Sequence, residues 1–385
     1  MKNILITGSS GFLGEELVNY FSDENKIYAL DKALPLQFEK NDSNIKKIVC
    51  DIRDKVILNK IFDENKIYAL DKALPLEFEK NDLNIKKITC DIRDKVTLSE
   101  IFNENKIDTI IHCAAEILDE KDPKEVWRTN YDGTKNLLDF AEQYSVEKFI
   151  FTSTFSIFEK NYNSPIDEKE PASAIVDYGK SKYAAENLIL SHTYKGSVVI
   201  FRCPVVIGKK RLDKLALLFE MVRKNLNIWL IGDGSNRIHF IYSLDLIMAI
   251  KECLDLKGKH LFNIGSDNVK SLKYVFQKLL DHAKSNKKIR KFPRLPGLII
   301  LKFFHLFGLV TLGPYHQRML VSNCVLNTDR IKKTIKWNPI YTNEKMLNEC
   351  YDNYLENLSI NKKSASSSKK MPNLKVINIL KFFNF

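Results

Sequence analysis

Short apolar segments that are typical of buried strands alternate with helical segments, and this alternation restricts the fold more than any other feature. The strand segments are KNILITG, KIYALD, KKITCD, DTIIHCAA, KFIFTST and SVVIFR, at residues 2–8, 26–31, 86–91, 108–115, 148–154 and 197–202. Strands that are apolar along their length and separated by helices predict a parallel sheet covered on both faces. We therefore expect an α/β protein with a doubly wound parallel sheet.

The chain is long enough for a second, smaller domain. After Gly208 the alternation becomes irregular, which predicts a sheet domain over residues 1–208, a partly interleaved substrate-side domain over 209–360 and a basic tail over 361–385. The seven cysteines form no Cys-x-x-Cys pair and no Cys/His cluster, so we expect neither disulfides nor a metal site. Residues 1–3 lead directly into a short apolar strand and a glycine loop, which predicts no signal peptide and a cytoplasmic protein.

A repeat occupies most of the first hundred residues. Residues 23–62 recur at 63–102 with six differences. Two nearly identical copies indicate a tandem duplication rather than a solenoid. Each copy predicts a strand, a loop, a second strand and a helix. In copy one the strands cover 26–31 and 47–51, and the helix covers 55–62. The links that join the two ends of the repeat to the rest of the sheet are too short to reach across extra strands. We therefore expect the sheet to use 26–31 from copy one and 87–91 from copy two, with the middle protruding, although 66–71 is an almost equivalent alternative.

The positive charge is confined to the C-terminal quarter. Residues 282–328 contain eight basic residues and no acid, and 361–385 contain six lysines and no acid. Together these two segments carry +14, whereas the whole chain carries +12, so the remaining residues sum to −2. Such charge suits an anionic substrate or a membrane surface. No nucleic-acid-binding motif accompanies it, so nucleic acid is not an expected partner.

A glycine loop, TGSSGFLG at residues 7–14, follows the first strand and opens a helix. Gly8 permits the tight turn, Gly11 lets backbone amides approach a pyrophosphate, and Gly14 allows close packing of helix and strand. Asp31 ends the next strand, where a carboxylate can bind ribose hydroxyls. The carboxylate would repel the 2′-phosphate of NADP, so the loop, including Phe12 and Leu13, predicts NAD in a Rossmann fold.

A tyrosine and a lysine four residues apart, Tyr178 and Lys182, lie on one face of a predicted helix. The ammonium would stabilise a phenolate, so that the tyrosine can exchange protons near neutral pH. The preceding strand ends in Thr152-Ser153-Thr154, where a hydroxyl can hold a substrate oxygen. This set predicts proton transfer to or from an alcohol.

Taken in order, these motifs resemble the extended short-chain dehydrogenase/reductase superfamily, the NAD-dependent epimerases and dehydratases. CDIRD, NYDGTKNLL, FRCPVVIG and GDGSNRIHFIYSLDL add to the likeness, which covers about residues 1–345. The resemblance implies that Thr154, Tyr178 and Lys182 form the catalytic set, with Tyr178 as acid and base. It also implies roles for residues outside this set: Asp91 and Ile92 beside the adenine, Cys113, Ala114 and Ala115 along the cofactor, Pro204 beside the nicotinamide, and Arg237 on a sugar-nucleotide pyrophosphate.

Two positions depart from that pattern. Phe158-Glu159 stands where many members have Tyr-Gly, and Val205 stands where the nucleotide-sugar members have Asn. Arg237 favours a nucleotide-sugar epimerase, dehydratase or reductase. The apolar stretch 295–313 and the basic C-terminal quarter favour a 3β-hydroxysteroid-dehydrogenase-like enzyme that acts on a lipid alcohol. An NAD-binding regulatory protein is the non-enzymatic alternative, against which the complete Thr/Tyr/Lys set argues.

Three further expectations concern partners. A small-molecule substrate follows from the catalytic set, and a homodimer is compatible with the family resemblance. Peripheral contact with the inner face of a membrane would use residues 284–313 and 361–385, because both segments combine apolar and basic residues. The stretch 295–313 is interrupted by Lys302 and His305 and predicts a helix of the substrate-side domain rather than a spanning one.

Overall fold

The computed structural model describes residues 2–22, 24–31, 85–116, 122–162, 165–209, 215–306 and 320–361. The chain divides into two compact units: unit 1 takes residues 1–154, 177–201 and 250–261, and unit 2 takes 155–176, 202–249 and 262–385. The units are interleaved in the sequence. The segment 155–176 belongs to unit 2 although unit 1 precedes and follows it, and the segment 250–261 belongs to unit 1 although unit 2 precedes and follows it. The division predicted at residue 208 therefore falls close to only one of the crossings.

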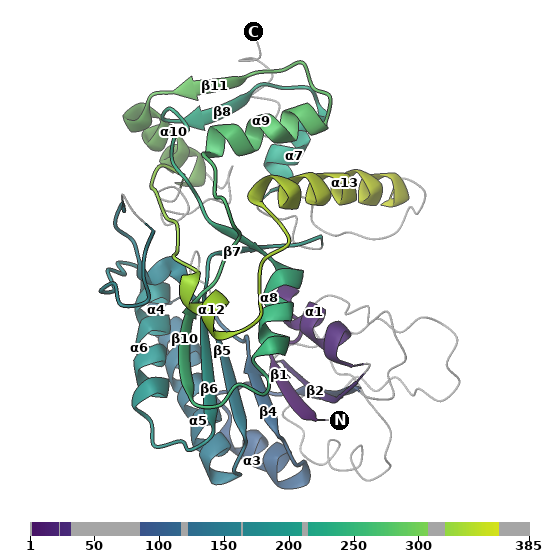
Figure 1. The fold of residues 1–385 in the computed structure, drawn as a ribbon, viewed down its shortest axis with the longest axis vertical. Coiled ribbons are helices and arrows are strands. Elements are labelled where there is room, and N and C mark those ends of the chain that lie inside the picture. The colour runs from purple at the N-terminus through teal and green to yellow at the C-terminus, as the bar shows by residue number, and fades with distance from the viewer. Residues whose placement is uncertain are drawn as a thin grey trace. The chain divides into compact units, whose positions relative to one another are not determined.

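Unit 1 is built on a seven-stranded sheet with the order β10-β6-β5-β4-β1-β2-β3 (Figure 1). The strands are β1 (Asn3–Thr7), β2 (Lys26–Asp31), β3 (Ile85–Thr89), β4 (Thr109–His112), β5 (Lys148–Thr154), β6 (Ser197–Cys203) and β10 (Lys259–Asn263). β1 pairs in parallel with β2 on one side and with β4 on the other. The chain thus reverses its direction of winding between β3 and β4, which is the doubly wound topology that the sequence predicts.

Apolar side chains cover both faces of this sheet. Leu5 and Tyr28 belong to the cluster formed with helices of one face, while Ile4 and Ile6, which alternate with Leu5 along β1, are also fully buried. The helices of this unit are α1 (Phe12–Phe21), α3 (Lys95–Glu104), α4 (Pro123–Trp127), the π-helix η2 (Arg128–Asp132), α5 (Gly133–Gln143) and α6 (Asp177–Ser191). α3, α5 and α6 supply the side chains of the first cluster. Burial on both faces explains why these strands are continuously apolar in the sequence.

Each copy of the repeat supplies one strand to the described sheet. β2 comes from copy one and pairs with β1, while β3 comes from copy two and pairs with β2, as the spacing argument predicts. β3 spans Ile85–Thr89 rather than the predicted 87–91, because the chain turns at Asp91, whose carbonyl accepts the amide of Asp94 at 2.8 Å. The predicted strands 47–51 and 66–71, the helix 55–62 and the protrusion lie outside the described residues.

Unit 2 contains two small parallel sheets. β7 (Val205–Ile207) pairs with β9 (Phe240–Tyr242), and β8 (Ile228–Ile231) pairs with β11 (Ile289–Phe292). Its other elements are η3 (Phe155–Ile157), α7 (Ala216–Arg223), α9 (Leu272–His282), α10 (Arg294–Leu306), α12 (Asp329–Thr334) and α13 (Asn343–Asn361), with α8 (Ser243–Glu252) divided between the units. The core of unit 2 packs α7, α9 and α13 around the strands.

The described part of the chain holds no helix long and apolar enough to cross a membrane. In the same residues no group of His, Cys, Asp and Glu side chains could hold a metal ion. The described cysteines are free thiols, and most are buried.

Candidate functional site

The glycine loop joins β1 to α1 at the edge of the sheet where the parallel strands end. Gly8 has a φ of +70°, and a Cβ there would lie 2.7 Å from the amide nitrogen of Ala114. A Cβ on Gly14 would lie 2.1 Å from the carbonyl oxygen of Gly8. The turn and the close packing of the helix on the loop therefore both require glycine.

Polar groups of this loop are available to a dinucleotide. The Ser9 and Ser10 hydroxyls are buried, and neither has a hydrogen-bond partner among the described residues. Such buried, unsatisfied groups are rare in folded proteins. The N-cap of α1, Gly11, offers no side-chain cap, so the first amides of the helix face the loop without one. Hydroxyls and helix amides in this position fit the phosphate and ribose oxygens of NAD.

Asp31 lies beside the same loop, at the end of β2. Its Oδ2 accepts the backbone amide of Ser10 at 3.1 Å, and its carbonyl oxygen accepts the amide of Cys90 at 2.9 Å. The carboxylate is half-buried. It therefore lies where the sequence predicts a partner for the ribose hydroxyls, and a loop amide already orients it.

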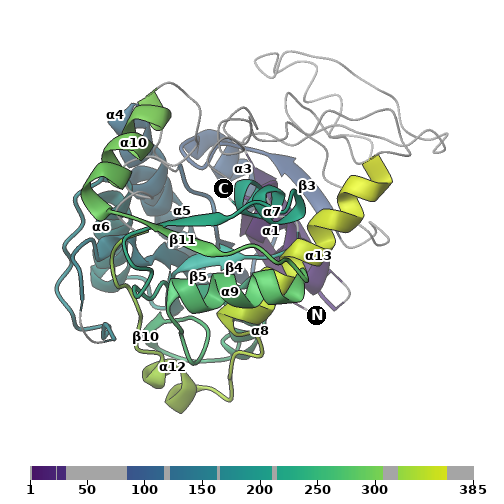
Figure 2. The same ribbon diagram turned by 90° about the horizontal axis from the view of Figure 1, so that it is seen from above.

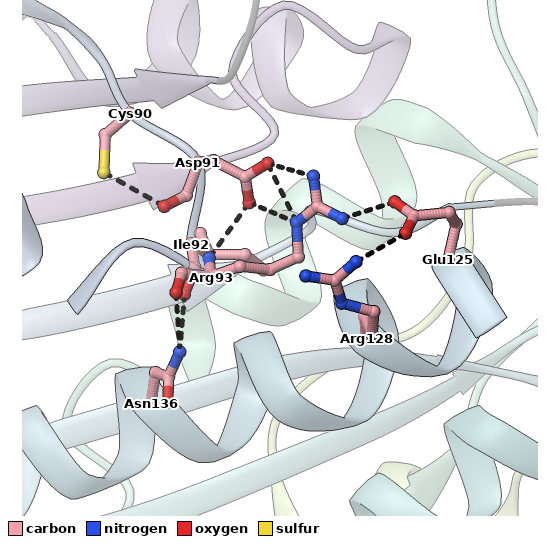
Figure 3. Close-up of polar contacts among 7 residues, drawn as sticks. All are labelled: Cys90, Asp91, Ile92, Arg93, Glu125, Arg128 and Asn136. Carbon is pink, nitrogen blue, oxygen red and sulfur yellow. Dashed lines mark hydrogen bonds and ion pairs between the residues drawn. The ribbon is translucent and has the colours of Figure 1, made fainter.

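Asp91 belongs to a chain of charged groups after β3 (Figure 3). Its carboxylate accepts hydrogen bonds from two nitrogens of the Arg93 side chain, from Nε at 2.9 Å to each oxygen and from Nη2 at 2.6 Å. Arg93 continues to Glu125 at 2.5 Å, and Glu125 to Arg128 at 2.8 Å. These arginines lower the pKa of Glu125, with the hydrogen bond from Arg93 as the largest cause. The predicted contact of Asp91 with adenine would therefore have to share a carboxylate that Arg93 already holds.

Ile92 is held by the helix that follows η2. Asn136 Nδ2 of α5 donates to its carbonyl oxygen at 3.1 Å (Figure 3), and a Cβ on Gly133 would lie 2.5 Å from its Cδ1. The residue is 4% exposed. The start of α5 thus fixes the backbone that is expected to flank the adenine.

A buried hydrogen-bond chain runs from β1 through β4 to the π-helix. Thr7 Oγ1 lies 2.7 Å from Nδ1 of His112, and Nε2 of His112 lies 2.9 Å from Thr134 Oγ1. Thr134 donates its own proton to the carbonyl of Asn130 at 2.6 Å, so it accepts from His112. His112 therefore carries its proton on Nε2 and accepts from Thr7.

His112 stays neutral in this position. It is fully buried, and this burial lowers its pKa well below the usual value, an effect that the charge of Lys182 reinforces. Cys113, the next residue, has its pKa raised to about 12 by burial, so its thiol stays protonated. Cys113, Ala114 and Ala115 follow β4 directly, and the amide of Ala114 donates to Thr7 Oγ1 at 3.3 Å. The residues that are predicted to lie along the cofactor are thus hydrogen-bonded to β1, the strand that leads into the glycine loop.

The predicted catalytic residues lie on β5 and α6, which pack together in unit 1. Lys182 is 1% exposed, and its ammonium lies 3.8 Å from the ring centroid of Phe151, three residues before Thr154 at the strand end. The ring of Phe151 lies 5.3 Å from that of His112. Tyr178 is half-buried in the first turn of α6. The structure therefore places Lys182 on the β5-facing side of the helix, with Tyr178 one turn earlier on the same face.

Two contacts that the sequence did not reveal fasten this helix. Glu186, fully buried on α6, accepts a short hydrogen bond from Ser153 Oγ of β5. Asn130 Nδ2 of the π-helix donates to Ser181 Oγ at 3.1 Å. π-helical turns often occur at functional sites. The spacing Tyr178, Lys182, Glu186 repeats every four residues, and this signal could have indicated a third residue facing β5.

Glu159, one of the departures from the family pattern, holds the segment that leads into α6. Its Oε1 accepts the backbone amides of Ile175 and Val176, both at 2.9 Å. Its own amide donates to Ser173 Oγ at 3.0 Å. A glycine in this position could not make the two side-chain contacts. Glu159 therefore fixes a loop that glycine would leave without these hydrogen bonds.

Pro204 and Arg237 belong to unit 2. Pro204 is buried between β6 and β7. The Arg237 backbone is bonded on both sides, to Asn323 Oδ1 at 2.8 Å and to the amide of Cys324 at 3.0 Å. Among the described residues no side chain bonds its half-buried guanidinium. An arginine whose backbone is fixed in this way suits a bidentate anion.

Comparison with known proteins gives the family. A model of the NAD dependent epimerase/dehydratase family matches residues 68–265, just over half of the chain. The chain belongs to the NAD-dependent epimerase/dehydratase family. The match begins inside copy two of the repeat and leaves out the glycine loop, although the structure pairs copy one with β1.

Members of this family are similar to the chain in sequence and in fold. A putative UDP-glucose 4-epimerase of Methanocaldococcus jannaschii is 26% identical over 288 residues, which cover 71% of this chain and 80% of that protein. The UDP-glucose 4-epimerase of Thermotoga maritima, solved with UDP-glucose, superposes with a TM-score of 0.67 at 20% identity, covering 92% of this chain and 99% of that one. A dTDP-glucose 4,6-dehydratase of Bacillus anthracis, solved with NAD, gives 0.66 at 21% identity, covering 93% and 98%. The Rossmann fold expected from the sequence is confirmed.

Proposed function

We propose that the chain is an NAD-dependent enzyme that oxidises and reduces a secondary alcohol of a nucleotide sugar, as a first step toward epimerisation or dehydration. The observation that carries the proposal is the position of the buried Lys182. It lies one helical turn from Tyr178, and its ammonium contacts the ring of Phe151, which is three residues before Thr154 at the end of β5. Bound NAD would accept the hydride from the sugar carbon.

The residues of the chain have separate tasks in this proposal. Tyr178 takes the hydroxyl proton, Thr154 holds the same oxygen, and the ammonium of Lys182 favours the ionised tyrosine and binds the nicotinamide ribose. Ser9, Ser10 and the first amides of α1 hold the pyrophosphate, and Asp31 holds the adenosine ribose. Cys113, Ala114, Ala115 and Pro204 border the cofactor, and Asp91 and Ile92 flank the adenine.

Arg237 supports the choice of a nucleotide sugar over a lipid alcohol. A guanidinium on a fixed backbone is suited to a diphosphate, which a sterol or a fatty alcohol lacks. The similarity to a putative UDP-glucose 4-epimerase over most of both chains points the same way.

The test is turnover by the purified full chain, with NAD and one nucleotide sugar at a time. UDP-glucose, UDP-galactose and dTDP-glucose are each incubated with enzyme, and products are separated by chromatography and weighed by mass spectrometry. We expect a new isomer or a product lighter by one water from at least one of them. If no nucleotide sugar is converted while a lipid alcohol reduces NAD to NADH, the substrate class is wrong.

A further inference from the structure

The helix α10 exposes a row of large apolar side chains. Five large apolar side chains on it are exposed: Leu295 (76%), Ile299 (69%), Ile300 (42%), Phe303 (55%) and Leu306 (80%). Four of them follow one another at spacings of four, four and three residues, so they form one stripe along the helix. Scattered exposed apolar residues are ordinary, but a contiguous stripe of this size marks an interaction surface.

The opposite face of α10 fixes the helix to its unit. Gly297 is buried there, and a Cβ on it would lie 3.1 Å from Ile231 of β8 and 3.2 Å from Phe292 of β11. Leu298 and Leu301 on this side are half-buried. Figure 2 shows α10 following β11, beside the sheet that β11 forms with β8. The helix is therefore held by one face and presents the other.

The charges within the chain segment that carries the stripe have a single sign. Between Asp281 and Asp329 the sequence has no acid. Described basic residues in this interval that are exposed are Lys284, Lys288, Arg290, Lys291, Arg294 and Lys302. Lys302 lies beside the stripe, where a long side chain can keep its ammonium in the headgroup layer while its methylenes lie along apolar neighbours. Apolar side chains bordered by cations match a surface that is apolar inside and anionic outside.

We propose that α10 lies in the headgroup region of an anionic lipid bilayer and holds the enzyme at the membrane surface. A helix of 13 residues is too short to cross a bilayer, so it would lie in the plane of the interface. Leu295, Ile299, Phe303 and Leu306 enter the acyl boundary, and the cations contact anionic headgroups. The charge complementarity selects a lipid surface over a second copy of this chain, because two copies would bring the same cations together.

The test measures binding of the full chain to vesicles by co-sedimentation. One set of vesicles contains phosphatidylcholine alone, and the other contains phosphatidylglycerol as well. We expect binding to the anionic vesicles, which weakens at high salt, and at least about tenfold weaker binding of the triple variant Leu295→Ser, Ile299→Ser, Phe303→Ser. A matched control, Val96→Ser with Ile340→Ser, alters two side chains that are as exposed but lie outside α10, and should bind as the unchanged chain does.

Two further arms separate α10 from other causes. The triple substitution is repeated in a chain that ends at Asn361, which lacks the six lysines of the tail, and should weaken binding there as well. The charge variant Lys291→Glu, Arg294→Glu should weaken binding to anionic vesicles with an unchanged melting temperature. Equal binding with and without the triple substitution would overturn the proposal. So would a triple variant that binds vesicles normally but changes from dimer to monomer in sedimentation, since a second copy would then cover α10.

Discussion

At the scale of single residues, the site depends on a cation in the protein interior. Lys182 is buried against an aromatic ring, and His112 behind the same ring is kept neutral by its own burial and by the lysine charge. A second cation there would raise the cost of holding the first. His112 is neutral and both of its ring nitrogens are hydrogen-bonded, so it is fixed in place and adds no second positive charge near Lys182.

Replacement of Tyr178 by phenylalanine should remove proton exchange alone. We expect kcat to fall by about 10²–10⁴-fold, the usual contribution of a positioned acid or base, while the dissociation constant for NAD stays within about twofold. Lys182→Ala should lower kcat and weaken NAD binding as well, since Lys182 has both tasks. Steady-state kinetics and calorimetric NAD titration measure the two effects. Near-normal turnover of Tyr178→Phe would refute the assignment.

Asp31, rather than its counterpart Asp71 in copy two, should bind the adenosine ribose. Loss of a hydrogen bond to a charged group costs roughly 1.5–3 kcal/mol, so Asp31→Ala should raise the NAD dissociation constant by about ten- to a hundredfold. Asp71→Ala is the matched control and should change it by less than about twofold. Titration of both variants with NAD decides. The reverse order would show that copy two supplies the strand beside β1 in solution.

At the scale of elements, α6 is positioned by contacts at several points along its length. Glu159 fixes the loop before it, Asn130 bonds Ser181 in its first turns, and Glu186 bonds Ser153 nearer its C-terminal end. Buried polar contacts of this kind select one arrangement of helix and strand. The position of α6 against the end of β5 is therefore set by residues other than Tyr178 and Lys182.

Glu159→Ala should loosen the entry to α6. Two backbone amides lose their acceptor, so we expect faster proteolysis within residues 173–176 and a several-fold lower kcat with little change in NAD affinity. Glu159→Gln keeps an oxygen in the same place and should behave nearly as the unchanged chain. Limited proteolysis followed by mass spectrometry locates the cleavage. If the alanine and glutamine variants are cut equally fast, the loop is held by something else.

Glu220 joins α7 to α13 and should make unit 2 sensitive to acid. Its carboxylate accepts hydrogen bonds from Arg223 on α7 and from Tyr354 of α13. Burial alone would raise the pKa, but these bonds and the one from Lys224 outweigh it and lower the pKa from 4.5 to about 2.

Because the pKa is lower in the folded chain, this stabilisation is present above pH 4.5 and is lost as the pH falls toward about 2. Glu220→Gln should reduce the free energy of unfolding at pH 7 by roughly 1–3 kcal/mol, and the difference from the unchanged chain should shrink below pH 4.5. Urea unfolding across this range measures it. A difference that stays constant with pH would exclude the ionised carboxylate as the cause.

At the scale of the whole molecule, the duplication should be dispensable. Since β2 comes from copy one and β3 from copy two, removal of residues 32–71 joins Asp31 to Lys72 and restores one hybrid copy. Thirteen residues then connect two parallel neighbours, close to the dozen that such a crossover needs. We expect a folded protein whose NAD dissociation constant is within about threefold of that of the full chain. Circular dichroism and NAD titration check this, and an aggregated product would show that the deleted residues 32–71 support the sheet.

The sequence by itself determined the class of fold, the glycine loop, and the strands and helix that carry Asp31, Thr154, Tyr178 and Lys182. These follow from local signals, because apolar periodicity, glycine spacing and a four-residue helical repeat act within short stretches of chain. The lengths of the links favoured one strand from each copy, since they limit how far each strand can lie from its neighbours, but the sequence left 66–71 as an almost equivalent alternative to 26–31.

Only the tertiary structure decided which side chains meet across those elements. Examples are the ion pair of Asp91 with Arg93, the hydrogen bonds that orient His112 and the contact of Glu186 with Ser153. In the same way, no local pattern specifies that Glu159 accepts the backbone amide of Ile175. The exposure of the α10 stripe was likewise beyond the sequence, which showed an apolar helix but not that its glycine face would pack on β8 and β11. Which face of an apolar helix is covered depends on what the rest of the chain brings to it.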